Sequence, residues 1–191
     1  MNTKHFLPAL LATLFFSITA LPASVQAQES QFPQRNEIVK VEHEDDSIGS
    51  IPEFLEVFSQ PGENGGKHYF LSVGHLGMGD QVVQLVFDPL FELFIPLGDS
   101  LDEAIQSLEE MQALYDEPVG TGIEEKGCLA FGFPNDKLET VKVSYRKFLL
   151  SRLLEFSVER EGYIRSTHIH RSDFKAILRG VKFHKKLYPN D

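Results

Sequence analysis

Two histidines separated by one residue, His168 and His170, are the side chains whose type and spacing best suit chemistry in this chain. Alternate residues of a β-strand project from the same face, so two imidazoles at this spacing can share one metal ion. A metal ion with an open coordination position activates water, and the pair therefore suggests a metal-dependent hydrolase. Zinc needs a third protein ligand, for which the sequence offers His184, His75, His43 or Asp173.

The strand that must position this pair is the second half of a predicted hairpin. Residues 148–160 form its first strand, with room for a bulge, Glu161-Gly162 is a two-residue turn, and residues 163–170 return. If Arg160 pairs with Tyr163, Glu155 faces His168 and Leu153 faces His170. Glu155 would then simply pair with His168 on a solvated sheet face, which is the alternative to a metal site.

A glycine-rich loop and a single cysteine are two further candidates for a functional role, and both are better interpreted as structural features. The loop Gly74–Gly79 is glycine-rich, but it lies between two predicted strands and lacks the lysine-serine pair of a phosphate-binding loop, so a hairpin loop is favoured. Cys128 is the only cysteine, which excludes an intramolecular disulfide. Its apolar surroundings predict a small buried side chain and not a nucleophile. We assign no catalytic residue and expect no cofactor.

Strand patterns dominate the chain, and helical patterns occur twice. The segment 51–58 is short enough for a strand, but its apolar spacing favours a short helix or turn. The predicted strands are residues 67–73 and 81–87 (a hairpin) and 90–95, followed by four more, or three if one is irregular: 123–126, 129–133, 139–146 and 148–160.

A helix is predicted over about 99–116, with Ser100 and Glu103 as a capping box. A second is predicted over 172–180 or longer, capped by Ser172. Gly180 either ends the second helix or lies within one that runs to Leu187. This order predicts an α+β fold, an antiparallel β-sheet with two amphipathic helices packed on one face.

The first 27 residues resemble a cleaved signal peptide. Lys4 precedes an uncharged run from Phe6 to Leu21, and Val25 and Ala27 suit a cut after Ala27. The run is shorter than the roughly 20 residues of a spanning helix, so no stable membrane anchor is expected after cleavage. Residues 28–48 then form a polar, partly disordered lead, and 49–191 a single domain. We expect a periplasmic or secreted protein.

Charge is distributed unevenly. The chain carries a formal net charge of −10, which argues against a nucleic-acid binder. Residues 28–139 hold 5 basic and 23 acidic side chains, whereas 140–191 hold 12 basic and 5 acidic ones. Either the two parts neutralise each other in the fold, or the molecule has a basic face for an anionic ligand.

These observations leave three functions open. The first is an exported, non-catalytic domain that binds a protein or a cell-envelope component. The second is the metal-dependent hydrolase centred on His168 and His170. The third is a carrier of a small apolar ligand, because 16 phenylalanines without any tryptophan could line a pocket as well as fill a core.

Overall fold

The computed structural model describes residues 35–43, 53–62, 65–75, 91–131, 138–160 and 162–189. They belong to one unit of the chain, 34–191. The predicted signal peptide, most of the lead and the predicted strand 81–87 lie outside the described residues.

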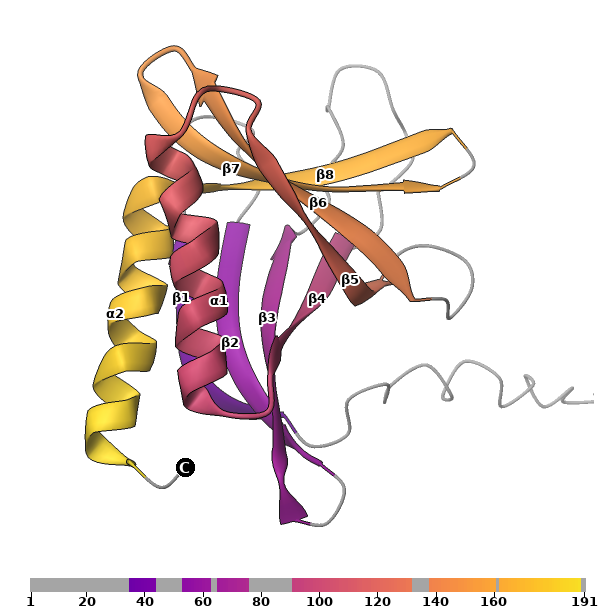
Figure 1. Ribbon diagram of the computed structural model, residues 1–191. Helices are drawn as coiled ribbons and strands as arrows, with labels where there is room; N and C mark the ends of the chain where they lie inside the picture. The colour runs from indigo at the N-terminus through magenta and orange to yellow at the C-terminus, as the bar shows by residue number, and fades with distance from the viewer. Residues whose placement is uncertain are drawn as a thin grey trace, which may run out of the picture. The chain divides into compact units, whose positions relative to one another are not determined.

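Eight strands form one sheet in which each strand pairs antiparallel with the next along the chain (Figure 1). They are β1 (Asn36–His43), β2 (Glu53–Pro61), β3 (Lys67–His75), β4 (Phe91–Gly98), β5 (Gly122–Phe131), β6 (Glu139–Phe148), β7 (Ser151–Arg160) and β8 (Tyr163–His170). The sheet curls into a half-barrel, so that β8 also contacts β2 and β3. The pairing is shortest between β4 and β5, where only Glu92–Phe94 takes part on the β4 side.

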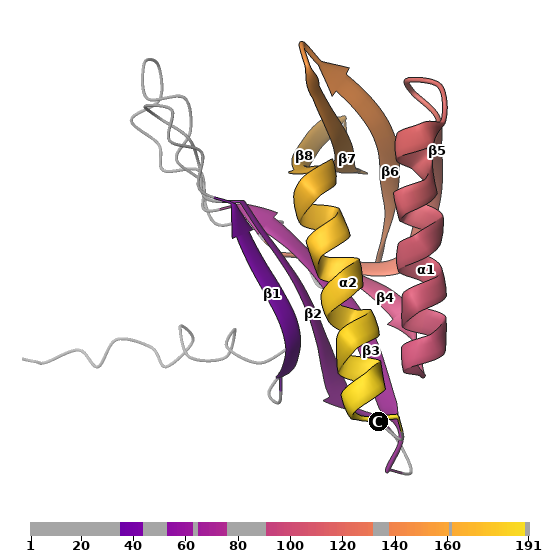
Figure 2. The same cartoon turned by 90° about the vertical axis from the view of Figure 1, so that its left-hand side faces the viewer.

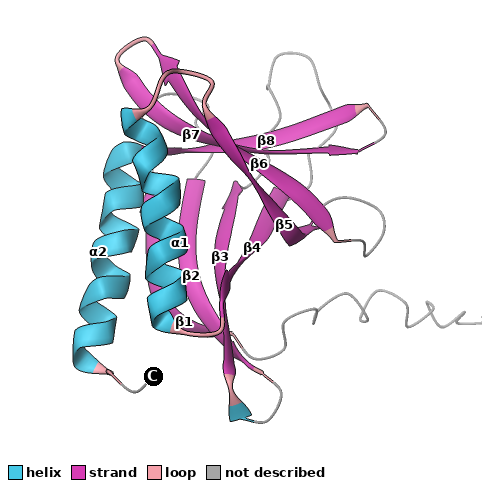
Figure 3. Ribbon diagram, viewed as in Figure 1, coloured by secondary structure: helices cyan, strands magenta, loops and turns pink. Residues whose placement is uncertain are grey.

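Two helices pack against the sheet, as Figures 2 and 3 show. Helix α1 (Leu101–Ala113) connects β4 to β5 and continues into a short 3-10 turn, Leu114–Asp116. Helix α2 (Arg171–Leu187) follows β8 directly and contacts β1 and α1. The predicted α+β class, with an antiparallel sheet and two helices packed on it, is confirmed.

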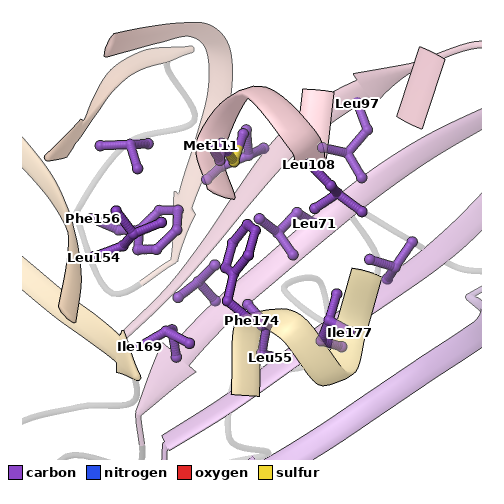
Figure 4. Close-up of a cluster of buried hydrophobic side chains, with 14 of the residues drawn as sticks. Leu55, Leu71, Leu97, Leu108, Met111, Leu154, Phe156, Ile169, Phe174 and Ile177 are labelled. Atoms are coloured by element: carbon purple, nitrogen blue, oxygen red, sulfur yellow. The ribbon is translucent and has the colours of Figure 1, made fainter. Parts of the chain in front are cut away.

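A single hydrophobic core lies between the sheet and the helices. Figure 4 shows that side chains from both helices and from strands of both halves of the sheet point toward one another. Phe174 and Ile177 of α2, for example, are fully buried together with Phe156 of β7. Burial of this kind contributes about 1.5–3 kcal/mol per large side chain.

Several local predictions are confirmed in detail. Ser100 caps α1, accepting a hydrogen bond from the Glu103 backbone N–H, and the Glu103 carboxylate accepts one from the Asp99 backbone N–H. The β7–β8 register is the one expected from the two-residue turn, with Arg160 opposite Tyr163 and Glu155 opposite His168.

Three local predictions are wrong, and an open alternative about the strand number is settled. The segment 51–58 contributes to strand β2 and not to a helix, because Phe58 on the outer face of the sheet is buried as fully as Leu55 on the core face. That two-sided burial removes the alternation typical of a strand. Of the alternatives of four strands or three after residue 122, the structure has three before β8, because β5 (Gly122–Phe131) is one strand with an irregularity at Gly127 (φ +73°). Residues 148–160 contain a turn at 149–150 before β7 begins.

The start of α2 is the third correction, and the length of this helix settles a second open alternative. His170 occupies the N-cap position, and the Ser172 hydroxyl bonds to Asp173 instead of capping the helix. The helix runs through Gly180 to Leu187. A Cβ at Gly180 would lie 2.5 Å from a methyl carbon of Val39, so glycine at this position permits α2 to cross β1 closely and does not end the helix.

Candidate functional site

The two histidines predicted as metal ligands lie together on the outer face of β8. His168 is exposed and His170 half-buried, while Thr167 and Ile169 between and beside them point into the core. Glu155 lies opposite His168 and binds the Arg146 guanidinium, with Nε 2.7 Å from the carboxylate oxygen. Partial burial, and then the neighbouring His170, lower the pKa of His168, and Glu155 opposes this shift.

The third ligand of a metal site is not found in the part of the chain that the structure describes. Within these residues no group of three histidine, cysteine, aspartate or glutamate side chains could hold a metal ion. His184 lies on α2 against the ring of Tyr188, 4.8 Å between centroids. The side chains of His43 and His75 lie outside the described residues. Metal binding by His168 and His170 therefore stays a prediction, and zinc titration of the folded protein measures it.

Cys128 is a structural residue. Its side chain is fully buried in the core, and burial raises the pKa of the thiol to about 12. A thiol with this pKa is protonated at neutral pH, whereas a nucleophile must be a thiolate. The sulfur donates a weak hydrogen bond to the Glu125 carbonyl at 3.4 Å.

The uneven charge distribution is partly compensated by ion pairs within the fold. Basic residues of the last 52 positions pair with acidic residues from earlier in the chain: Lys182 with Glu109, Lys185 with Asp102, Arg171 with Asp116 and Arg160 with Glu139. The first two pairs connect α2 to α1. A shallow groove of about 420 Å³ remains between the helices, lined by Lys175 and Arg179 among others.

A charged cluster on the outer face of β2–β4 is internally satisfied. Arg35 places one guanidinium nitrogen 2.9 Å from Glu56 and 3.0 Å from Glu92, and its guanidinium carbon lies 4.4 Å from the centroid of the Phe58 ring. Burial raises the pKa of Glu56, and Arg35 opposes this. Each of these charges has a partner, so the cluster serves to fix the start of β1 on the sheet.

The most unusual surface in the described chain is the turn between β6 and β7. Phe148 pairs with Ser151, which leaves Leu149 and Leu150 as a two-residue turn. The three consecutive apolar side chains are 69%, 81% and 95% exposed. In Figures 1 and 2 this hairpin projects past the ends of α1 and α2. We call Phe148–Leu150 the apolar tip.

The backbone of the apolar tip is also unusual. Leu149 has φ +53°, and it is the only non-glycine residue with positive φ in the described part of the chain. An L-residue in this region costs roughly 1–2 kcal/mol, which is why hairpin turns of this kind favour glycine or asparagine. The turn therefore has an unfavourable backbone conformation in addition to its exposed apolar surface.

Two positive charges flank the apolar tip. Lys147 lies directly opposite Arg152 in the β6–β7 register, and like charges in this position repel. The structure shows no ion pair for Lys147 within the described residues. Arg152 lies 3.9 Å from Asp116, whose two carboxylate oxygens are bound by Arg171 at 2.7 and 2.9 Å. The acidic group nearest to Arg152 is thus already engaged.

The base of the hairpin is fixed on the rest of the domain. Tyr145 exchanges two backbone hydrogen bonds of 2.9 Å with the loop after α1, accepting from Gly120 and donating to Thr121. Its ring packs edge-on against Tyr115, whose hydroxyl donates to the Ile169 carbonyl at 2.9 Å. The same loop exposes Val119. The apolar tip is consequently carried on a rigid support.

Comparison with known proteins gives no match, whether to a family model, to a curated protein or to a solved structure. A search of the helices in the described part of the chain finds none that is both long and apolar enough to cross a membrane.

The apolar tip was not predicted from the sequence. Phe148, Leu149 and Leu150 were assigned to the first three positions of a strand over 148–160, with a helix as the alternative, because the apolar run here fits both patterns. One feature of the sequence could have revealed the turn: the apolar triplet is bracketed by Arg146-Lys147 and Arg152, and strict alternation begins only after it, at Leu154.

Proposed function

We propose that this protein is an exported, non-catalytic domain that binds a component of the cell envelope through the apolar tip. Export rests on the first 27 residues, which have the charge pattern and small-residue ending of a signal peptide. Binding rests on the apolar tip itself. The periplasm or the cell exterior is where both features would act together.

The observation that carries the proposal is that three unfavourable features coincide within six residues. Leucine occupies a positive-φ position, three large apolar side chains are exposed, and Lys147 lies opposite Arg152. None of these features helps the domain fold, because a Gly-containing turn would connect β6 and β7 with less strain. Exposed apolar groups and local backbone strain concentrate at binding sites.

We propose a non-catalytic role because the side chains best suited to catalysis, a cysteine and two histidines, lack the surroundings that catalysis needs. Cys128 is buried and protonated, and His168 and His170 have no third ligand in the part of the chain described. The core side chains between sheet and helices, such as Leu71, Leu108 and Phe156, are fully buried against one another. This packing favours a filled core over a carrier's ligand pocket.

The test uses the protein as its producing cell processes it, with mass spectrometry to identify its first residue, which we expect to be Gln28. Wild type, the tip variant Phe148→Ser/Leu149→Gly/Leu150→Ser and the control variant Tyr163→Ser/Ile164→Ser are sedimented with isolated cell envelopes. The control removes exposed apolar groups from the β7–β8 end.

We expect wild type and the control variant to sediment with the envelopes and the tip variant to remain in the supernatant. The proposal is wrong if the tip variant, shown to be folded by circular dichroism, sediments as wild type does. It is equally wrong if wild type does not sediment.

A further inference from the structure

We infer that the component bound by the apolar tip is the surface of a lipid bilayer that carries anionic headgroups. This inference rests on the proposed function and narrows it to one partner. Phe148, Leu149 and Leu150 would enter the boundary between headgroups and acyl chains, and Lys147 and Arg152 would contact phosphate groups around them.

The dimensions of the hairpin fit this placement. The Lys147–Arg152 pair lies two residues from the turn, which at about 3.3 Å per residue puts the charges roughly 7 Å behind the outermost leucines. Interfacial segments bury their apolar face about 5–10 Å into the headgroup and acyl boundary. Long basic side chains at that depth keep their charged ends at the headgroups while their methylenes lie along apolar surface.

The shape of the site favours a soft surface over a folded protein. A stable protein interface buries about 800 Å² on each partner and is usually well matched in shape. The apolar tip is instead a projecting two-residue turn, with Val119 on the neighbouring loop as a further exposed apolar group. Projection from a rigid base, fixed by the bonds of Tyr145 to Gly120 and Thr121, suits insertion into a fluid layer.

The net charge of the chain, −10, does not conflict with an anionic partner. Exposed charges interact over a Debye length of about 8–10 Å at physiological salt, so acidic groups far from the hairpin are screened. Near the hairpin Arg146 pairs with Glu155, and Asp116 is shared between Arg171 and, at 3.9 Å, Arg152. Lys147 and Arg152 flank the apolar tip directly, so they are the charges placed to meet the headgroups around it.

The absence of tryptophan from the chain permits a direct test. Leu150→Trp places a single indole at the most exposed position of the apolar tip, and Ile164→Trp places one at the β7–β8 end as a matched control. Each variant is mixed with vesicles of phosphatidylcholine alone or of phosphatidylcholine with phosphatidylglycerol, and its emission is recorded. Flotation of unlabelled wild type with the same vesicles accompanies the measurement.

With anionic vesicles we expect a blue shift for Leu150→Trp, quenching of that emission by brominated acyl chains, and no change for Ile164→Trp. Each basic residue near an anionic surface contributes about 1 kcal/mol, so Lys147→Gln/Arg152→Gln should weaken vesicle binding about 30-fold. Raised salt should weaken wild-type binding and affect this double variant much less.

Two results overturn the inference. If neither Leu150→Trp nor wild type responds to vesicles, while wild type still sediments with envelopes in a tip-dependent manner, the partner is an envelope protein and the proposed function stands. If Ile164→Trp shifts as strongly as Leu150→Trp, the bilayer is not recognised by the apolar tip. Loss of envelope binding altogether would reject the proposed function as well.

Discussion

The β6–β7 and β7–β8 hairpins belong to the same antiparallel sheet and share strand β7, yet their turns are built from different residues. The β7–β8 turn has Gly162 at φ +83°, the residue type for which a positive φ carries no steric cost. The β6–β7 turn has Leu149 at φ +53° followed by Leu150. The two turns therefore differ in backbone strain, and the strained one is the turn to which we assign the proposed binding role.

Charges near the two turns differ in the same way. Arg160 beside the β7–β8 turn is paired with Glu139 on β6, with Nε 2.8 Å from the carboxylate oxygen. Lys147 and Arg152 beside the β6–β7 turn lie opposite each other instead. Both ends expose apolar side chains, so exposure alone does not distinguish them. The combination of backbone strain, exposed apolar side chains and two like charges opposite each other does distinguish them.

Glycine should occur in this chain where a side chain would clash with a neighbour or where the backbone has a positive φ. The largest expected effect on stability comes from replacing Gly180. Gly180→Ala brings a methyl group against Val39, and overpacking of this kind destabilises a fold by about 1–3 kcal/mol. The higher helix propensity of alanine offsets about 1 kcal/mol of this loss. We expect a net loss of stability of up to about 2 kcal/mol, measured by urea denaturation. In a Val39→Ala background the same change should become stabilising, and an equal loss in both backgrounds would contradict the close-approach account.

A smaller effect is expected at the β7–β8 turn. Gly162→Ala forces a side chain into the positive-φ region, which costs roughly 1–2 kcal/mol, and it recovers part of this because alanine restricts the unfolded chain. We expect a net loss of about 1 kcal/mol, measured by denaturation. If Gly162→Ala leaves the free energy of unfolding unchanged, a side chain at positive φ costs little in this sheet. The argument that Leu149 is strained would then fail as well.

The smallest effect concerns pH and the histidines of β8. Because the pKa of His168 is lowered in the fold, the folded protein binds fewer protons than the unfolded chain as pH falls below the ordinary histidine value of about 6.5. The free energy of unfolding should therefore decrease as the pH is lowered from 7.5 to 5.5. The His168→Gln variant should lose less stability over the same interval, because it lacks this imidazole. Equal losses for the two proteins would show that His168 is not the group responsible.

Much of the fold follows from local patterns in the sequence. The β7–β8 register was predictable residue by residue, because a two-residue turn fixes which positions face each other and the period of two fixes the rest. Helix α1 was predictable because Ser100, Glu103 and the apolar face agree with one another. Neither depends on distant parts of the chain.

The predictions that failed depend on long-range contacts. Phe58 is buried on the outer face against Phe70 and Phe94, from β3 and β4, and this burial hides the alternation of β2. Gly180 is explained only by Val39, 141 positions earlier, on β1. The apolar tip was missed for a related reason: the flanking basic residues hint at a turn, but only the packing of the whole sheet shows that Phe148–Leu150 lie outside the core.

The most direct test of the account replaces the leucine turn by an ordinary one. Leu149→Gly/Leu150→Ser should stabilise the domain by about 0.5–1 kcal/mol, because relief of the positive-φ strain exceeds the added flexibility of glycine in the unfolded chain. The same variant should bind anionic vesicles at least tenfold more weakly than wild type, since two apolar side chains no longer enter the bilayer. A variant that is more stable and binds more weakly is the predicted result, and a variant that binds vesicles as tightly as wild type would contradict the account.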